Sequence, residues 1–252
     1  MAEVSVTSWS DTCAVGDTSQ TPKGPGSIGE WRAFNSLNTA RSFHCAALAY
    51  DPETDPEFYY LYVAGGLNAS GEPLDSIEYI KVRKEGPKDQ TTGAWKVSEN
   101  TLGTARYGCG AYTVDATAHS VVDVDESWLY FAGGATSTGT TGETYAGLVQ
   151  HNGELGEWQE VDSMTPARAG FASASANDSL YAFGAQKGKV NGTSVSAAIG
   201  VAPDLENWNS LSISMWEDRV WAGSAQESAV ISIVGGTTDS EAATRSTEWT
   251  NY

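Results

Sequence analysis

Short runs of β-branched, aromatic and alanine residues recur along the chain, and each run ends on glycine. The four clearest runs cover residues 60–66, 128–134, 180–185 and 231–236. Apolar runs of this length that stop at turn residues are typical of buried β-strands. The first glycines of successive runs lie 68, 51 and 51 residues apart. This spacing predicts an all-β chain assembled from repeated units.

Two further marks precede each glycine-terminated run, in the same order every time. The nearer mark is an arginine, and the farther mark is a tryptophan 10 or 11 positions before it. The arginines are Arg41, Arg106, Arg168 and Arg219, and the tryptophans are Trp31, Trp95, Trp158 and Trp208. Three recurring marks with loops of variable length between them indicate one structural unit used four times.

The alternation of apolar and polar residues between these marks predicts four strands in each of three units and three strands in the last. The predicted strands are 42–50, 58–64, 76–83 and 93–98; 107–114, 127–132, 144–150 and 156–161; 169–176, 179–183, 195–202 and 206–211; and 219–225, 229–234 and 245–251. Residues 29–34 carry the Gly-x-Trp pattern of a fourth strand but have no unit before them. We therefore expect residues 29–34 to complete the last unit.

The repeat resembles the kelch repeat, and the resemblance covers residues 29–252. It rests on the Trp, Arg and Gly-Gly marks together with Ser-Ile-Glu-Tyr at 76–79 and Ser-Thr-Glu-Trp at 246–249. The second unit has only Glu-Thr-Tyr at 143–145, and the third has Gly-Ala at 184–185 and no such third strand. The resemblance implies a β-propeller of four-stranded blades arranged around an axis.

The expected architecture is a four-bladed propeller over residues 29–252, closed by the N-terminal strand. A fifth blade, or a ring completed by another chain, are the alternatives. Residues 2–9 read as an extra strand, and residues 10–28, rich in Ser, Thr, Gly and Pro, read as a linker.

Charge narrows the set of partners. The chain has 14 basic and 32 acidic side chains, a net charge of −18. Such a chain repels phosphate backbones, which excludes nucleic acid and disfavours anionic membranes. A basic protein, a neutral glycan or a divalent cation is compatible with this charge. The chain opens without a signal-peptide pattern and has no membrane-spanning run, so no membrane insertion is expected.

The loops of an antiparallel propeller fall on two faces, and their chemistry differs. One face carries acidic segments at 51–57 and 123–126, which are candidates for Ca²⁺ although the EF-hand spacing is absent. The other, which we name the hydroxyl-rich face, carries loops 67–75, 135–143, 185–193 and 237–244, rich in Gly, Ser, Thr and Asn.

The hydroxyl-rich face is the predicted binding surface, and no cofactor is expected there. The candidate binding residues are Asn68, Ser137, Asn191 and the four arginines Arg41, Arg106, Arg168 and Arg219. Arginines around an axis could bind a carboxylate in a bidentate manner. The alternative is that each arginine is held locally by loop carbonyls of the next blade, because all four share one repeat position.

The sequence contains few residues or motifs that are typical of an enzyme active site. The chain has three histidines and three cysteines, and it lacks a nucleophile elbow and a phosphate-binding loop. His44 next to Cys45, and Cys109 on the next inner strand, give a weak hint of a metal or redox site at the axis. Otherwise the cysteines read as small apolar side chains, with one disulfide left open.

These observations favour a non-catalytic recognition or scaffolding domain that binds a protein or a glycan. Its composition, poor in Lys and rich in Thr, Ser and Trp, indicates a cell-surface or extracellular location, with a cytoplasmic one as the alternative. A structural subunit of a larger assembly is the second hypothesis, and a metal-dependent enzyme with a site on the axis is the third.

Overall fold

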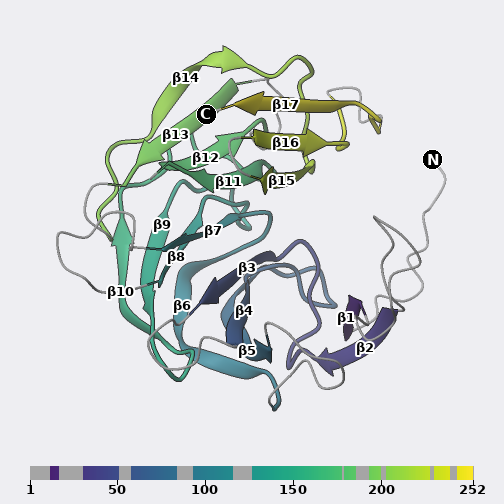
Figure 1. The fold of residues 1–252 in the computed structure, drawn as a ribbon, viewed down its shortest axis with the longest axis vertical. Helices are drawn as coiled ribbons and strands as arrows, with labels where there is room; N and C mark the ends of the chain where they lie inside the picture. Colours follow the sequence, from purple (N-terminus) through teal and green to yellow (C-terminus); the bar gives the residue numbers. More distant parts are fainter. Residues whose placement is uncertain are drawn as a thin grey trace.

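The chain is a four-bladed β-propeller made of antiparallel sheets arranged around an axis (Figure 1). The computed structural model describes residues 12–16, 31–50, 58–83, 93–115, 127–177, 179–185, 193–199, 203–227, 230–238 and 243–251. Strands account for all the regular structure in this part of the chain.

The strands follow the predicted units closely. Blade one contains β3 (Cys45–Tyr50), β4 (Phe58–Ala64), β5 (Leu74–Arg83) and β6 (Lys96–Arg106). Blade two contains β7 (Gly110–Asp115), β8 (Ser127–Ala132), β9 (Thr144–Val149) and β10 (Leu155–Val161). Blade three contains β11 (Ala172–Ala176), β12 (Ser179–Phe183), β13 (Thr193–Ala198) and β14 (Asn209–Ser214). Blade four contains β15 (Gly223–Glu227), β16 (Val230–Val234) and β17 (Thr247–Asn251).

The core lies between the blades, because a single sheet must bury both of its faces. All six residues of β8 are buried, as expected for a strand with a neighbouring blade on each side. One apolar cluster joins blades one and two, a second joins blades two and three, and a third joins blades three and four. The inner strands β3, β7, β11 and β15 pack against one another in this order around the axis.

The repeated tryptophans connect one blade to the previous one. The indole N–H of Trp158 in blade two donates to the Thr101 carbonyl of blade one at 3.0 Å. Trp208 makes the equivalent bond from blade three to Asp162 of blade two at 3.1 Å. The spacing of the tryptophans along the chain therefore reflects how the blades stack.

The Gly-Gly mark and the arginine mark meet in the fold. Gly133 adopts a φ of 65°, and a Cβ atom there would lie 2.7 Å from the Arg168 carbonyl oxygen. The next amide, that of Gly134, donates to the same oxygen at 2.9 Å. Close backbone contact between blades two and three thus requires glycine at the end of β8.

The predicted closure of the last blade is wrong. Among the described strands, β17 (Thr247–Asn251) pairs with β16 alone, and β2 (Trp31–Ser36) pairs antiparallel with β1 (Thr12–Gly16). Residues 12–16 were expected to be part of a linker, but they form a strand that pairs with β2. The predicted strand at 2–9 lies outside the described residues.

The segment β2 nevertheless lies where a fourth strand of a preceding blade would lie. Trp95 of blade one donates its indole N–H to the Asn35 carbonyl at 2.8 Å, as Trp158 and Trp208 do to the blades before them. The Gly-x-Trp pattern thus indicated a fourth-strand position for β2, whereas the predicted pairing of this strand with the last blade is wrong. Figure 1 shows the β1–β2 pair beside blade one and separate from the last sheet.

Candidate functional site

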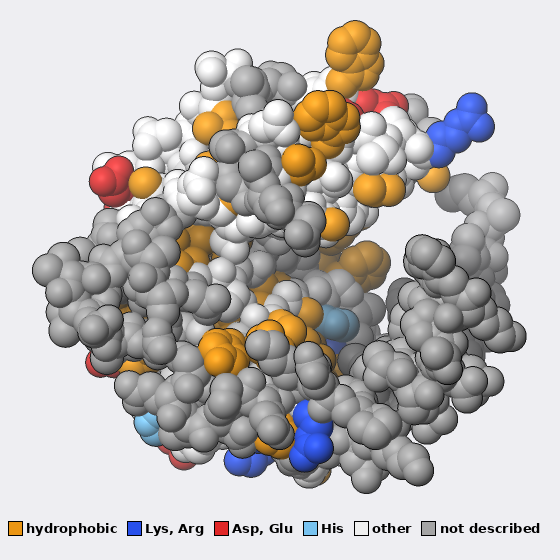
Figure 2. All heavy atoms as spheres, viewed as in Figure 1, with side chains coloured by type: hydrophobic (Ala, Val, Ile, Leu, Met, Phe, Trp, Pro, Cys, Tyr) orange, Lys and Arg blue, Asp and Glu red, His pale blue; other side chains and the backbone are white. Residues whose placement is uncertain are grey.

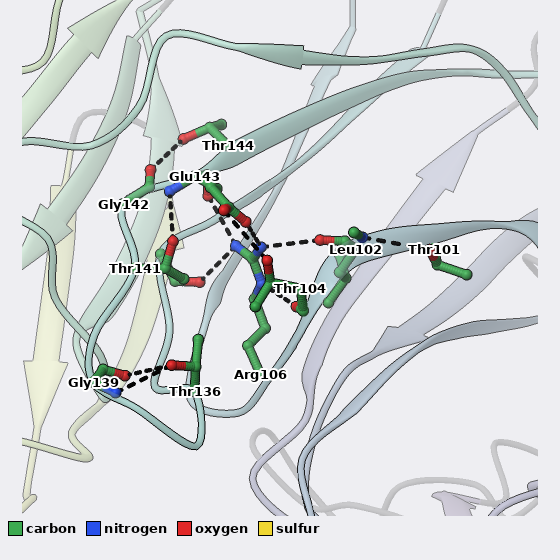
Figure 3. A network of polar contacts seen from close by, with 12 residues as sticks. Thr101, Leu102, Thr104, Arg106, Thr136, Gly139, Thr141, Gly142, Glu143 and Thr144 are labelled. Carbon is green, nitrogen blue, oxygen red and sulfur yellow. Dashed lines mark hydrogen bonds and ion pairs between the residues drawn. The ribbon is translucent and has the colours of Figure 1, made fainter.

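The four repeated arginines are buried, and each holds its blade together. Arg106 donates from Nη1 to the Glu143 and Gly133 carbonyls at 3.0 and 3.3 Å. Its Nη2 donates to the Leu102 carbonyl at 2.9 Å and pairs with the Glu143 carboxylate. Figure 3 shows this guanidinium surrounded by acceptors from two segments of blades one and two. Each of the three guanidinium nitrogens therefore donates to an acceptor of the protein.

The Ser-x-Glu motif of the third strand provides the carboxylate for two of these arginines. Arg41 pairs with Glu78 at 2.6 Å, and Arg219 pairs with Glu248; both arginine side chains are fully buried. Glu78 also accepts the backbone N–H of Asn38 at 2.7 Å and of Thr39 at 3.0 Å. A buried ion pair with its remaining acceptors satisfied is the arrangement that tolerates burial.

The arginines therefore do not face a ligand, and the hypothesis that they bind a carboxylate does not fit their position. Arg168 is also buried and donates to the Gly184 carbonyl at 2.7 Å. Burial lowers the pKa of Arg106 and of Arg168. The alternative, that loop carbonyls hold each arginine, is the geometry observed, and it accounts for the shared repeat position.

The other predicted binding residues lie in the loops of the hydroxyl-rich face. Asn68 organises its own loop, since its side-chain oxygen accepts the N–H groups of Ser70 and Glu72, both at 2.9 Å. Ser137 is exposed at the tip of the next such loop. Asn191 and the acidic segments 51–57 and 123–126 lie outside the described residues, so the Ca²⁺ hypothesis stays a prediction.

A feature that the sequence analysis missed lies two residues after each arginine. The four residues at this position are Phe43, Gly108, Gly170 and Trp221, with φ values of 54°, 62°, 67° and 59°. Glycine adopts this left-handed conformation readily, whereas it costs a residue with a Cβ about 1–2 kcal/mol. Two repeats therefore carry the residue that the backbone favours, and two carry a large aromatic residue instead.

These four residues form a chain of backbone hydrogen bonds around the axis. Gly108 N–H donates to the Phe43 carbonyl at 2.7 Å, and Gly170 N–H donates to the Gly108 carbonyl at 2.8 Å. Trp221 N–H then donates to the Gly170 carbonyl at 2.7 Å. One residue from each of the four blades thus contributes to a single line of peptide groups.

The Trp221 indole lies across this line. A Cβ atom on Gly108 would fall 2.6 Å from its six-membered ring, and a Cβ on Gly170 would fall 2.9 Å from the ring fusion. Trp221 also contacts Phe43, with ring centroids 5.1 Å apart. The glycines of blades two and three therefore leave room for the aromatic side chains of blades one and four.

Both aromatic side chains remain open to solvent. Phe43 is 48% exposed and Trp221 is 43% exposed, and partly buried Tyr107 contacts Phe43 edge-on at 6.4 Å. We name Phe43, Tyr107 and Trp221 the axial platform. It lies among the connections that carry the arginines, on the hydroxyl-rich face.

A disulfide lies directly beneath the platform. Cys45 and Cys109 are joined, with Cα atoms 5.6 Å apart, within the roughly 4.4–6.8 Å usual for disulfides. The bond links the first inner strand to the segment that leads into the second. Of the alternatives that the sequence left open for Cys45 and Cys109, the structure therefore shows the disulfide, and not free apolar side chains or a metal or redox site. Neighbouring His44 has its pKa lowered from 6.5, first by burial and then by the Arg41 charge.

The axial platform presents two exposed aromatic rings and one phenol, and the backbone amides of Gly108, Gly170 and Trp221 beneath it are already hydrogen-bonded. Over the described part of the chain, no three His, Cys, Asp or Glu side chains are grouped so as to hold a metal ion. None of the described segments is a helix able to span a membrane.

The residues of the platform could have been found by aligning the four repeats on their arginines. Glycine at that position in two repeats signals a left-handed backbone, and Phe43 or Trp221 in the same register then stands out as an exception. Comparison with known proteins adds no name to this site, since no family model matches the chain and no curated protein is significantly similar to it.

Proposed function

We propose that this chain is a non-catalytic recognition domain that binds a protein or glycan ligand through the axial platform and the loops around it. The carrying observation is that Phe43 and Trp221 are aromatic where the backbone favours glycine. Backbone strain that the surrounding structure tolerates is concentrated at functional sites. Exposed aromatic side chains with few rotatable bonds are effective contact residues, because they lose little entropy on binding.

We infer that the chain is a kelch-type propeller. The repeated order of Trp, Arg and Gly-Gly supports this inference, as do the two Ser-x-Glu motifs whose carboxylates pair with Arg41 and Arg219. In this interpretation the marks that define the repeat maintain the fold. The residues that differ between repeats are free to recognise a ligand, which is why the platform interrupts the repeat.

An extracellular or cell-surface location is part of the proposal. The disulfide between Cys45 and Cys109 supports it, because such bonds persist in oxidising compartments and are rare in the cytosol. The net charge of −18 supports a soluble surface that does not adhere to nucleic acid.

The proposal is tested by comparing Phe43→Gly with Phe43→Ala. Both variants lose the ring, so both are expected to lose binding to the same degree in a pull-down from the chain's native surroundings. The Gly variant is expected to be more stable than the Ala variant by about 1 kcal/mol in urea unfolding, since φ is positive there. Equal retention of binding by both variants would remove the platform from the proposal.

A second candidate function, a structural subunit, is favoured by the last sheet. Hydrophobic side chains stand out from the surface over this sheet (Figure 2), where Trp216, Val234 and Trp249 are exposed. Exposed aromatic residues beside an edge strand favour assembly with another chain. Sedimentation of the wild type and of Trp249→Lys separates this candidate from the first, because only assembly through β17 is weakened by that change.

A further inference from the structure

We propose that the ligand of the axial platform is a neutral pyranose glycan, stacked on Trp221 and Phe43 and held by the hydroxyl side chains of the surrounding loops. This inference rests on the proposed recognition function and specifies its ligand. Four observations carry it: the arrangement of the rings, the hydrogen bonding of the backbone, the hydroxyl groups of the loops, and the net charge of the chain.

The arrangement of the rings favours a ligand with an apolar face. Phe43 and Trp221 touch each other, with centroids 5.1 Å apart and planes inclined by 54°. Rings in mutual contact form a continuous patch, whereas an aromatic cage for a cation needs rings that surround an empty volume. The C–H face of a pyranose packs on such a patch while its hydroxyl groups point outward to the rim.

The backbone at the platform is already paired, which disfavours an extended peptide. The amides of Gly108, Gly170 and Trp221 each donate to a carbonyl of the preceding blade at 2.7–2.8 Å. A peptide added as a strand depends on free main-chain donors and acceptors. Recognition at the platform must therefore come from side chains, as it does for sugars.

The hydroxyl-rich loops start beside the platform. Backbone bridges join Ser42 to Leu67, Tyr107 to Ala135 and Val220 to Thr237, so the loops of three blades start beside the platform residues. Hydroxyl side chains follow these bridges in each loop; they include Ser70, Ser137, Thr138 and Thr238, while the amide of Asn68 holds its own loop in place. These groups donate and accept hydrogen bonds, which matches the hydroxyl groups of a sugar ring.

The charge selects a neutral sugar. The net charge of −18 repels carboxylated and sulfated glycans. The arginines nearest the platform are buried and hold carbonyl and carboxylate groups of the protein, so these four are not offered to an anion. His44, the neighbouring titratable group, has its pKa lowered by burial and is neutral at pH 7.

The test uses the full-length chain on an array of neutral pyranose oligosaccharides, together with acidic oligosaccharides and a proline-rich decapeptide. The strongest neutral binder is then titrated by calorimetry into the wild type, Trp221→Gly, Phe43→Ala and Trp216→Ala. Trp216 is the matched control, because it is 95% exposed and lies outside the platform. Thermal unfolding verifies that each variant is folded.

We expect at least one neutral oligosaccharide to bind the wild type and Trp216→Ala equally, and to bind Trp221→Gly and Phe43→Ala at least tenfold more weakly. The inference is overturned if no neutral oligosaccharide binds, or if an acidic one binds best. If the decapeptide binds and the platform variants abolish that binding, the glycan assignment fails while the recognition function stands. If glycans bind and all variants bind them alike, both the assignment and the platform fail.

Discussion

Each buried arginine satisfies several carbonyl oxygens that a propeller leaves unpaired where its strands end. Arg41 donates to the Gly65 and Ser76 carbonyls at 2.8 and 3.0 Å and pairs with the Glu78 carboxylate. Only the planar guanidinium has enough donors in a fixed geometry to reach these acceptors together. The arginine is therefore a structural part of the repeat.

Arg41→Lys is expected to lower the free energy of unfolding by about 2–3 kcal/mol. The charge is kept, but the ammonium group cannot reach both carbonyls and Glu78, so buried acceptors lose their donors. Urea unfolding measures the loss. Arg245→Lys is the control, because Arg245 is exposed, and it is expected to change the stability by less than about 0.5 kcal/mol. Equal effects at the two positions would contradict the structural role.

His44 is expected to make the protein less stable in mild acid. Burial, and then the Arg41 charge, lower its pKa in the folded state, so the unfolded chain binds more protons once the pH falls below 6.5. The free energy of unfolding therefore decreases from pH 7.5 to pH 5.5. His44→Gln should remove that part of the decrease in urea titrations at the two pH values. An unchanged pH dependence would show that His44 is not responsible.

At the scale of strands, the repeat predicted most of the fold. Most strands of the four blades lie within a few residues of their predicted ranges, because each run had to alternate or be wholly apolar to fill the space between blades. The exception is β6, which was predicted to end at residue 98 and continues to Arg106. The partner of β2 was not predicted, because residues 12–16 were expected to be linker and instead form the strand that pairs with it.

The candidate site was harder to predict than the fold. The binding face remains a prediction, but the arginines chosen for it have buried side chains, and the aromatic residues two positions later were overlooked. Burial of an arginine depends on acceptors from segments far along the chain, such as Ser76 for Arg41, and a single sequence does not display them. The sign of φ at Phe43 likewise follows from the stacking of the blades.

Close approach between the β8–β9 loop and the segment that follows β10 should make Gly142 sensitive to substitution. A Cβ atom there would lie 2.1 Å from the Met164 carbonyl oxygen, and Met164 N–H donates to the Gly142 carbonyl at 2.6 Å. Gly142→Ala is expected to cost about 1–3 kcal/mol in thermal or urea unfolding, because backbone must move. Gly139→Ala, with open space around the added carbon, should be as stable as the wild type or slightly more so.

For the whole molecule, the disulfide is expected to be a major contributor to stability. It joins Cys45 to Cys109, 64 residues apart, and so constrains a long loop of the unfolded chain. The double variant Cys45→Ser/Cys109→Ser is expected to lose about 2–4 kcal/mol. A reducing agent should lower the wild type to the same level and leave the variant unchanged. Cys13→Ser serves as the control, and a loss of similar size there would contradict this pairing.

The platform also joins the first blade to the last. Phe43 begins the line of backbone hydrogen bonds around the axis and Trp221 ends it, while β17 has no described strand partner besides β16. The contact between the two rings therefore links blade four to blade one. A ligand that touches both rings acts as a noncovalent crosslink at this place. Ligand binding therefore stabilises the contact between blades four and one, and any change that weakens this contact should weaken ligand binding as well.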